Sequence, residues 1–497
     1  MKKNIIANFI GRFWSVFSNF LFIPLYIHYL GFESYSIISF TLIIAGLMAI
    51  LDVGLSATLS REFARIDNSL KEKIRIFKTL ESSYFIIIGL CIILIYALSG
   101  IIANNCLKLS TFDTNRVSFF LKIISFDVGF QLLLRFYMGG LLGLEKQVEA
   151  NLYQIGWGML RNGLVVVAIF IVPTLEIFFI WQSISTIIFA LLFRFSLNKT
   201  LTAQYKFGFH PKIEISVIRS IWRFAAGMLL MALIASLNSQ IDKLVISKLL
   251  PIESLGYYTL AISLATGLIV IVSPISMALL PRLTALYSVD KKEEASILFH
   301  KINLYVVILV FSVMSNMIFF AKELIWVWTG KMALAENTYL LVPFIVFAYA
   351  MLSLQIIPYN VAIANGYTKI YNILGFAFLF ITLPGYWFAT KSQGAIGAAY
   401  VFCGVQSISA LVFLYFINRK FIHTKRISTL YIKQILFPLL ISLSIAFVFS
   451  IIPSWIENSR ITSLIWIGFS TICTLVTTLV ILVPISEVKQ IIKNIYI

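Results

Sequence analysis

The chain has 497 residues, of which 60% are hydrophobic and only 12% are charged, about half the charged share of a soluble globular protein. Its formal net charge of +18 lies in short segments between apolar runs, without the aromatic–basic clusters of an RNA or DNA surface, which argues against a nucleic-acid partner. The composition therefore excludes a soluble globular protein and predicts one that spans a lipid bilayer.

The predicted elements are apolar runs long enough to cross a bilayer, which takes about 20 residues per helix. The first run reaches about Leu30, contains Arg12 and lacks a small-x-small cleavage site, so we interpret it as a retained helix and not as a signal peptide. The runs lie near 5–30, 35–60, 79–103, 118–143, 152–172, 176–196, 220–247, 255–280, 302–321, 339–363, 372–390, 395–417, 434–452 and 461–483. The sequence thus predicts an all-α polytopic membrane protein of about fourteen transmembrane helices.

Lysine and arginine are distributed unevenly between alternate loops. With the N-terminus inside, the inner loops contain dense groups such as Lys71, Lys73 and Arg75, whereas the outer loops contain few basic residues. Cytoplasmic loops of membrane proteins retain positive charge. We therefore expect a multi-pass protein of the bacterial inner membrane with both termini in the cytoplasm.

A weak internal repeat relates the two halves of the chain. Arg61, near the end of the second predicted helix, and Arg282, near the end of the eighth, lie about 220 positions apart, and other loop residues share this offset. An even number of helices separates the copies, so they are parallel, which predicts two six-helix lobes of the transporter type. The predicted divisions are an N-lobe (1–200), a cytoplasmic linker (201–219), a C-lobe (220–420) and two extra helices (421–497).

The candidate functional residues are the ionisable side chains within the apolar runs. Each costs at least about 2.5–3.5 kcal/mol at the bilayer centre if it faces lipid, so we expect these side chains to face protein, water or a partner. Scattered cysteines and histidines, with no CxxC pair, indicate neither a disulfide framework nor a metal site. The ionisable residues are Arg12, Asp52, Lys122, Asp127, Arg135, Arg161, Arg223, Asp242 and Lys243.

Cations outnumber anions in this set, and guanidinium groups bind phosphate and carboxylate oxygens bidentately. The set therefore predicts an anionic cargo. Arg223 and Lys243 also lie close enough to predicted helix ends to reach the interface, and Asp242 beside Lys243 fits a structural pair equally well. We assign a cationic cavity to Arg12, Lys122, Arg135, Arg161 and Arg223, ion coupling or structural pairing to Asp52, Asp127, Asp242 and Lys243, and a cytoplasmic gate to Arg61 and Arg282.

Several segments resemble a known family. Leu51-Asp52-Val53-Gly54 with Arg61, and Ile241-Asp242-Lys243 followed by Leu255-Gly256-Tyr257-Tyr258, resemble the polysaccharide-transporter branch of the multidrug/oligosaccharidyl-lipid/polysaccharide (MOP) exporter superfamily. The resemblance extends to about residue 420. It implies a fold like that of multidrug-extrusion (MATE) proteins and of the lipid II flippase MurJ.

The resemblance implies a flippase of the O-antigen (Wzx) type, which moves an undecaprenyl-pyrophosphate-linked oligosaccharide from the cytoplasmic to the periplasmic leaflet by alternating access. By position, the resemblance implies that Arg12, Asp52, Arg61 and Asp242 correspond to functional residues of these flippases. Expected partners are inner-membrane lipid and the polymerase and chain-length regulator of the same pathway. Coupling to H⁺ or Na⁺ is expected, without another cofactor. Many O-antigen flippases are interpreted as having twelve helices, whereas about fourteen are predicted here. A capsule, exopolysaccharide or lipid II-type flippase therefore stays an alternative.

Two further alternatives fit the sequence less well. A MATE-like drug/cation antiporter would need an acidic surplus in its lumen, and the surplus here is basic. A membrane glycan polymerase or lipid-linked glycosyltransferase would present catalytic residues on a long outer loop, whereas the largest loops predicted here have about twenty residues. We therefore expect a transporter and not an enzyme.

Overall fold

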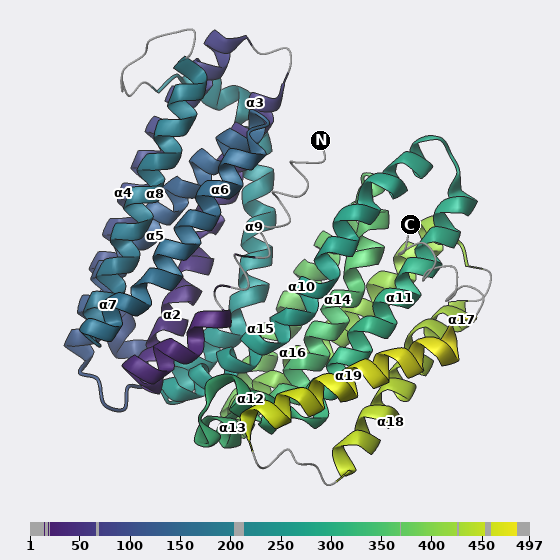
Figure 1. Cartoon of the computed structure of the whole chain (residues 1–497). Coiled ribbons are helices and arrows are strands. Elements are labelled where there is room, and N and C mark those ends of the chain that lie inside the picture. The colour runs from purple at the N-terminus through teal and green to yellow at the C-terminus, as the bar shows by residue number, and fades with distance from the viewer. Residues whose placement is uncertain are drawn as a thin grey trace. The chain divides into compact units, whose positions relative to one another are not determined.

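The computed structural model describes residues 14, 18, 20–65, 69–202, 213–367, 369–424, 427–452 and 459–484. These residues form helices and no strand, apart from one isolated bridge between Lys108 and Pro251 (Figure 1). Thirteen helices are long and apolar enough to cross a membrane, and Phe20–Leu30 is a shorter apolar helix. This confirms the predicted all-α polytopic fold. Half of the first predicted helix, near 5–30, lies outside the described residues.

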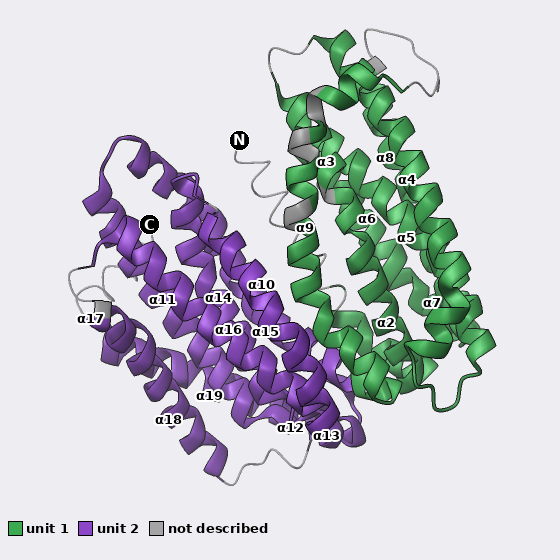
Figure 2. Ribbon diagram, turned by 180° about the vertical axis from the view of Figure 1, so that it is seen from behind, with its two compact units in different colours: residues 1–256 green, residues 257–497 purple. Residues whose placement is uncertain are grey.

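The chain divides into two compact units, unit 1 (Met1–Gly256) and unit 2 (Tyr257–Ile497) (Figure 2). The elements up to the boundary are α2 (Phe32–Met48), α3 (Ile50–Ala64), α4 (Leu70–Asn105), α5 (Thr114–Gly143), α6 (Gln147–Gly158), η1 (Met159–Leu164), α7 (Val165–Ile171), α8 (Leu175–Thr202), α9 (Ile215–Leu249) and α10 (Ile252–Ser288), which crosses it. Unit 2 continues with α11 (Lys292–Phe319), α12 (Ala321–Thr329), α13 (Met332–Thr338), α14 (Val342–Ala364), α15 (Lys369–Gln393), α16 (Ala395–Ile417), η2 (Asn418–Ile422), α17 (Ile427–Tyr431), η3 (Ile432–Leu436), α18 (Phe437–Ile451) and α19 (Arg460–Leu482).

Compact packing units and repeat-related lobes are different ways to divide a chain. Helix α9 packs on α2, α3 and α4 and therefore counts with unit 1. The lobes at 1–200 and 220–420, with their linker, stay a prediction. What the packing does establish is that the residues up to 256 enclose their own interior, and the buried charges lie there.

Two of the described helices begin with a serine cap. Ser69 precedes α4 and its hydroxyl accepts a hydrogen bond from the Glu72 backbone N–H at 3.3 Å. Ser459 does the same for Thr462 at the start of α19, at 3.2 Å. Such side chains satisfy N–H groups that have no partner within the helix. Helix α12 ends at Gly330, whose φ of 73° is a left-handed conformation that glycine adopts at little cost.

Helix α5 packs mainly against α3, α4 and α8 of unit 1. It can approach α3 closely because of two glycines four residues apart. A Cβ atom on Gly139 would lie 2.9 Å from the Ser56 carbonyl oxygen, and one on Gly143 would lie 2.5 Å from the Ser60 carbonyl oxygen. Small residues at this spacing allow backbones to pack tightly in membranes. This contact brings the polar residues of α5 next to those of α3.

Unit 2 contains two helices that the sequence analysis did not assign, α12 and α13, between the predicted runs 302–321 and 339–363. Both are too short to cross a bilayer, so the search for runs of about 20 apolar residues could not find them. Arg460, at the start of α19, donates from Nε and Nη2 to the Val327 carbonyl oxygen at 3.1 and 2.6 Å. Within unit 2, this contact ties α12 to the second of the two extra helices.

Candidate functional site

Three clusters of ionisable side chains lie in the interior of unit 1. Each is centred on a carboxylate that is almost completely buried: Asp52 is 7% exposed, Glu81 4% and Asp127 5%. We name them the Asp52, Glu81 and Asp127 clusters. A carboxylate is expensive to bury unless it is paired and hydrogen-bonded. The partners of each carboxylate therefore indicate what its cluster can do.

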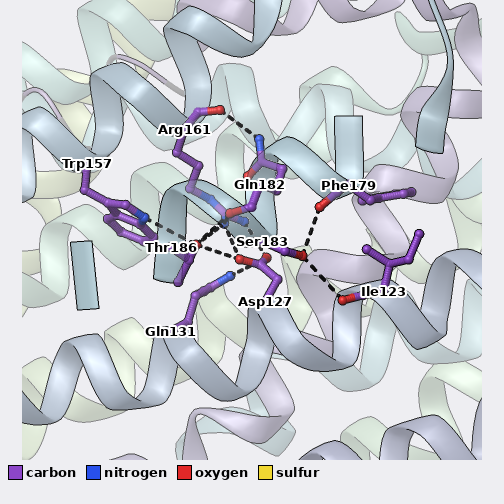
Figure 3. A network of polar contacts seen from close by, with 9 residues as sticks. All are labelled: Ile123, Asp127, Gln131, Trp157, Arg161, Phe179, Gln182, Ser183 and Thr186. Carbon is purple, nitrogen blue, oxygen red and sulfur yellow. Dashed lines mark hydrogen bonds and ion pairs between the residues drawn. The ribbon is translucent and has the colours of Figure 1, made fainter. Parts of the chain in front are cut away.

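In the Asp127 cluster, a guanidinium and a carboxylate form a bidentate ion pair (Figure 3). Arg161 donates from Nη1 to Asp127 Oδ1 at 2.6 Å and from Nη2 to Asp127 Oδ2 at 2.9 Å. Asp127 belongs to α5 and Arg161 to the π-helical turn η1. This two-pronged geometry is the strong form of the arginine–carboxylate pair.

Two neutral side chains complete the surroundings of the Asp127 carboxylate. Gln131 Nε2 lies 2.9 Å from Oδ2, and Thr186 Oγ1 of α8 lies 2.6 Å from Oδ1. A carboxylate has about four acceptor positions, and four donor atoms from three side chains now surround this one. An additional proton or metal ion would have to displace one of them. The Arg161 guanidinium also lies over the Trp157 ring, 5.4 Å from its centroid.

The backbone beneath Arg161 is held by neighbouring side chains. In a π-helix the usual i→i−4 hydrogen bonds are interrupted, and three successive carbonyl oxygens of η1 accept side-chain donors. Trp181 Nε1 donates to Leu160 O at 2.8 Å, and Gln182 Nε2 donates to Arg161 O at 2.9 Å. Tyr26 donates its hydroxyl proton to Asn162 O at 2.6 Å. The position of Arg161 is therefore fixed from both its side chain and its main chain.

The Asp52 cluster joins α3, α4 and α5. Tyr84 donates its hydroxyl proton to Asp52 Oδ1 at 2.6 Å and lies 3.2 Å from the Leu132 carbonyl oxygen. Arg135 interacts with Asp52 electrostatically, and Ser56 donates to the Arg135 carbonyl oxygen at 3.0 Å. Among the described residues, none forms an ion pair with the half-buried Arg135 guanidinium. Arg135 thus lies near the Asp52 carboxylate without forming the close ion pair that engages Arg161.

The Glu81 cluster was not predicted from the sequence. Glu81 Oε1 accepts hydrogen bonds from Tyr137 Oη at 2.7 Å and from Arg194 Nε at 2.8 Å, which joins α4, α5 and α8. Both charged residues fall inside the predicted runs 79–103 and 176–196, but near their ends, where ionisable side chains usually reach the interface. Counting every ionisable residue within a run, whatever its distance from the end, would have found this pair.

Lys122, Asp242 and Lys243 make contacts outside these three clusters. Lys122 lies over the Tyr96 ring, 5.2 Å from its centroid. Lys243 donates to the Ser239 carbonyl oxygen at 2.5 Å, and its ammonium is 4.0 Å from Oδ1 of the buried Asp242. Arg12 lies outside the described residues, and the side chain of Arg223 is not described. A contribution of these residues to one cavity stays a prediction.

The two predicted gate arginines have different surroundings within their own units. Arg61 is half exposed and lies 3.8 Å from the buried Glu62, which also pairs with Arg65 at 3.6 Å. Arg282, in α10, is exposed. Their role as a gate stays a prediction. In the part of the chain that the structure describes, no group of three histidine, cysteine, aspartate or glutamate side chains is arranged to hold a metal ion.

Comparison with known sequences identifies relatives. The profile of a family described as "Polysaccharide biosynthesis protein" matches residues 1–287. A protein named "Putative O-antigen transporter" from Shigella flexneri is 21% identical over 381 residues, which cover 74% of this chain and 86% of that protein. These matches confirm the resemblance to the polysaccharide branch of the exporter superfamily.

Solved structures with the same fold include two kinds of transporter. The lipid II flippase MurJ in an inward closed conformation superposes with a TM-score of 0.74 at 17% identity, covering 96% of this chain and 98% of that one. An inward-facing MATE family transporter superposes with a TM-score of 0.64 at 14% identity, covering 82% and 94%. The MATE/MurJ-like fold prediction is confirmed. The Shigella protein and the two solved structures are named as transporters or a flippase, in agreement with the prediction that the chain is a transporter and not an enzyme.

Proposed function

The chain belongs to the polysaccharide biosynthesis protein family, and from this premise we propose that it moves a lipid-linked oligosaccharide across the bacterial inner membrane. The proposed cargo is an undecaprenyl-pyrophosphate-linked oligosaccharide of the O-antigen type, with a capsule or exopolysaccharide unit as the alternative. The proposed direction is from the cytoplasmic to the periplasmic leaflet, by alternating access. Both termini are proposed to be cytoplasmic. The Shigella O-antigen transporter and the MurJ fold support this class of cargo.

The observation that carries the proposal is the Arg135 guanidinium. It is half buried in α5, which is long and apolar enough to cross the membrane, and no described residue forms an ion pair with it. Such a charge is retained in a membrane protein where it serves a function. A guanidinium presents its N–H groups in a planar fork that fits two oxygens of a phosphate. We propose that Arg135 contacts the diphosphate of the cargo, together with Arg12, Lys122 and Arg223.

The same geometry disfavours a cationic drug as the cargo. Such a cargo needs an available carboxylate in the interior. In unit 1, Asp52 accepts from Tyr84, Glu81 from Tyr137 and Arg194, and Asp127 from Arg161, Gln131 and Thr186. The three carboxylates of the clusters are already engaged by donors of the protein itself. A guanidinium without an ion partner is the complementary situation, and it suits an anion.

The test uses a bacterial strain that lacks its own flippase and displays surface glycan only when this chain is supplied. Arg135→Ala should abolish surface glycan while lipid-linked precursor accumulates, because the diphosphate loses its guanidinium contact; Arg135→Lys should retain part of the display. The matched control is Arg116→Ala on the same helix, where the side chain is exposed and paired with Glu176. Protein amounts are compared by immunoblot of membranes. Full glycan display by Arg135→Ala would contradict the proposal.

A further inference from the structure

We infer that the Asp127 cluster is a cation-binding site that is filled by a cation of the chain itself, the guanidinium of Arg161. The site would take a small cation from solution if Arg161 were shortened. Cation binding at this site would lie within unit 1 and would not depend on the identity of the cargo. Three features define the site: the kinds of oxygen atom around Arg161, the contacts that hold these oxygens, and the backbone that places the guanidinium among them.

Three oxygens of different kinds surround the Nη1 atom of Arg161. They are a carboxylate oxygen, Asp127 Oδ1 at 2.6 Å, a hydroxyl oxygen, Thr186 Oγ1 at 2.8 Å, and a main-chain carbonyl oxygen, Gln182 O at 3.4 Å. Carboxylate, hydroxyl and carbonyl oxygens, supplemented by water, are the ligands that hard cations take in proteins. Nη1 therefore occupies the place where an exchangeable cation would sit.

The oxygens are held together by contacts that do not involve Arg161. Thr186 Oγ1 lies 2.6 Å from Asp127 Oδ1 and 2.9 Å from Gln182 O, and donates its single proton to one of them. Gln131 Nε2 holds the other carboxylate oxygen at 2.9 Å. Figure 3 shows these groups converging on the guanidinium. Removal of the arginine side chain would thus leave an arranged set of oxygens with a net negative charge.

The fixed backbone of η1 makes the guanidinium a permanent occupant. The carbonyl oxygens of Leu160, Arg161 and Asn162 each accept a hydrogen bond from a side chain of another helix. The main chain at Arg161 is therefore already ordered, and placing its guanidinium in the site costs little further conformational entropy. A cation attached to the chain has a local concentration that the ionic composition of the cell cannot change. Unit 1 should therefore keep this site occupied whatever the Na⁺ concentration. Any coupling ion would have to act at a carboxylate outside the three clusters, such as Asp242.

The experiment restores the missing cation from solution. Purified full-length Arg161→Ala is heated in detergent with increasing millimolar methylguanidinium, Na⁺ or K⁺, with choline chloride keeping the ionic strength constant. Binding to the native state alone raises the unfolding midpoint in a saturable way, here by about 2–5 °C. We expect such a rise with methylguanidinium, which has the same planar guanidinium group that the variant lacks, and a smaller rise with Na⁺ or K⁺. The unfolding midpoint of the wild-type protein should not rise with any of these cations.

The double variant Asp127→Asn/Arg161→Ala is the matched control, because it lacks the carboxylate charge and should not respond to any of the cations. The inference is overturned if Arg161→Ala shows no saturable rise with any cation, or if the double variant shows the same rise. If Arg161→Ala is not recovered as folded protein in choline chloride, recovery is measured with methylguanidinium present during solubilisation. Recovery of folded Arg161→Ala with methylguanidinium, but not with choline chloride at the same ionic strength, supports the site. Failure to recover folded protein with every cation refutes it.

Discussion

The interiors of the two units use different polar chemistry. Every buried carboxylate in the described part of the chain lies in unit 1, and two of them form buried pairs with Arg161 and Arg194. The buried polar residues described in unit 2 are neutral. Asn316 bonds Thr474 and Ser470, and Asn360 bonds Ser276. The ion pairs described in unit 2, such as Lys291–Glu294, are exposed.

This difference separates two reasons for polar residues in a membrane protein. Amide and hydroxyl groups between helices contribute modest hydrogen bonds and fix how the helices pack. Buried charges cost far more and leave a large penalty when one partner is lost. Unit 2 therefore uses polar groups as packing contacts. Unit 1 buries charged groups and therefore carries the larger desolvation cost. It also contains Arg135, which forms no close ion pair with the described residues.

The largest expected stability effect breaks an ionic cluster of unit 1. Glu81→Ala would remove the acceptor that the half-buried Arg194 guanidinium and the buried Tyr137 hydroxyl share, and should reduce the free energy of unfolding by about 3 kcal/mol. The measurement is the unfolding midpoint of the purified protein and its yield from membranes. Glu81→Leu combined with Arg194→Met removes both charges and should recover most of the loss. A single variant as stable as wild type would show that the pair is not what holds α4 to α8.

A smaller effect is expected from the neutral contacts of unit 2. Asn316→Ala removes the hydrogen bonds to Thr474 and Ser470 and should cost about 1–2 kcal/mol, since each such bond contributes modestly. Thermal unfolding is again the measurement, with Asn337→Ala as the exposed control. A loss as large as that of Glu81→Ala would remove the distinction between the two interiors.

The smallest effect is expected at the exposed ion pairs of unit 2. Lys291 and Glu294 are 2.7 Å apart, with both side chains more than half exposed at 55% and 57%. Solvent-exposed pairs contribute about 0–1 kcal/mol, so Lys291→Ala should shift the unfolding midpoint by no more than the error of the measurement. A clear destabilisation that high salt does not reduce would indicate that this pair is not simply solvated.

Much of the fold could be predicted because the bilayer imposes a local rule. Every backbone group within the hydrocarbon must be satisfied inside its own segment, so each long apolar run becomes a helix. The predicted run 395–417 coincides with α16, and 461–483 is shifted by one residue from α19. The rule does not apply to α12 and α13, which are short, or to the π-helical turn at Arg161, whose carbonyl oxygens are held by side chains of other helices.

The candidate site could be predicted only as a set of residue types. Asp127 and Arg161 were both identified from the sequence as charges within apolar runs, and Arg161 was assigned to the cargo. In the structure the two form a closed pair, and Arg135, eight positions from Asp127 on the same helix, has no described ion partner. About 80° separates Asp127 and Arg135 around the helix, so they face different neighbours, and no property of α5 alone identifies those neighbours.

The sequence by itself determined that this chain is a bundle of membrane-crossing helices with buried charge, because hydropathy and helix length are properties of one segment at a time. The tertiary structure alone decided which charges neutralise one another, because pairing depends on the distance between atoms on different helices. Of the three arginines in the clusters, Arg161 and Arg194 form close ion pairs with carboxylates, and Arg135 forms none with the described residues.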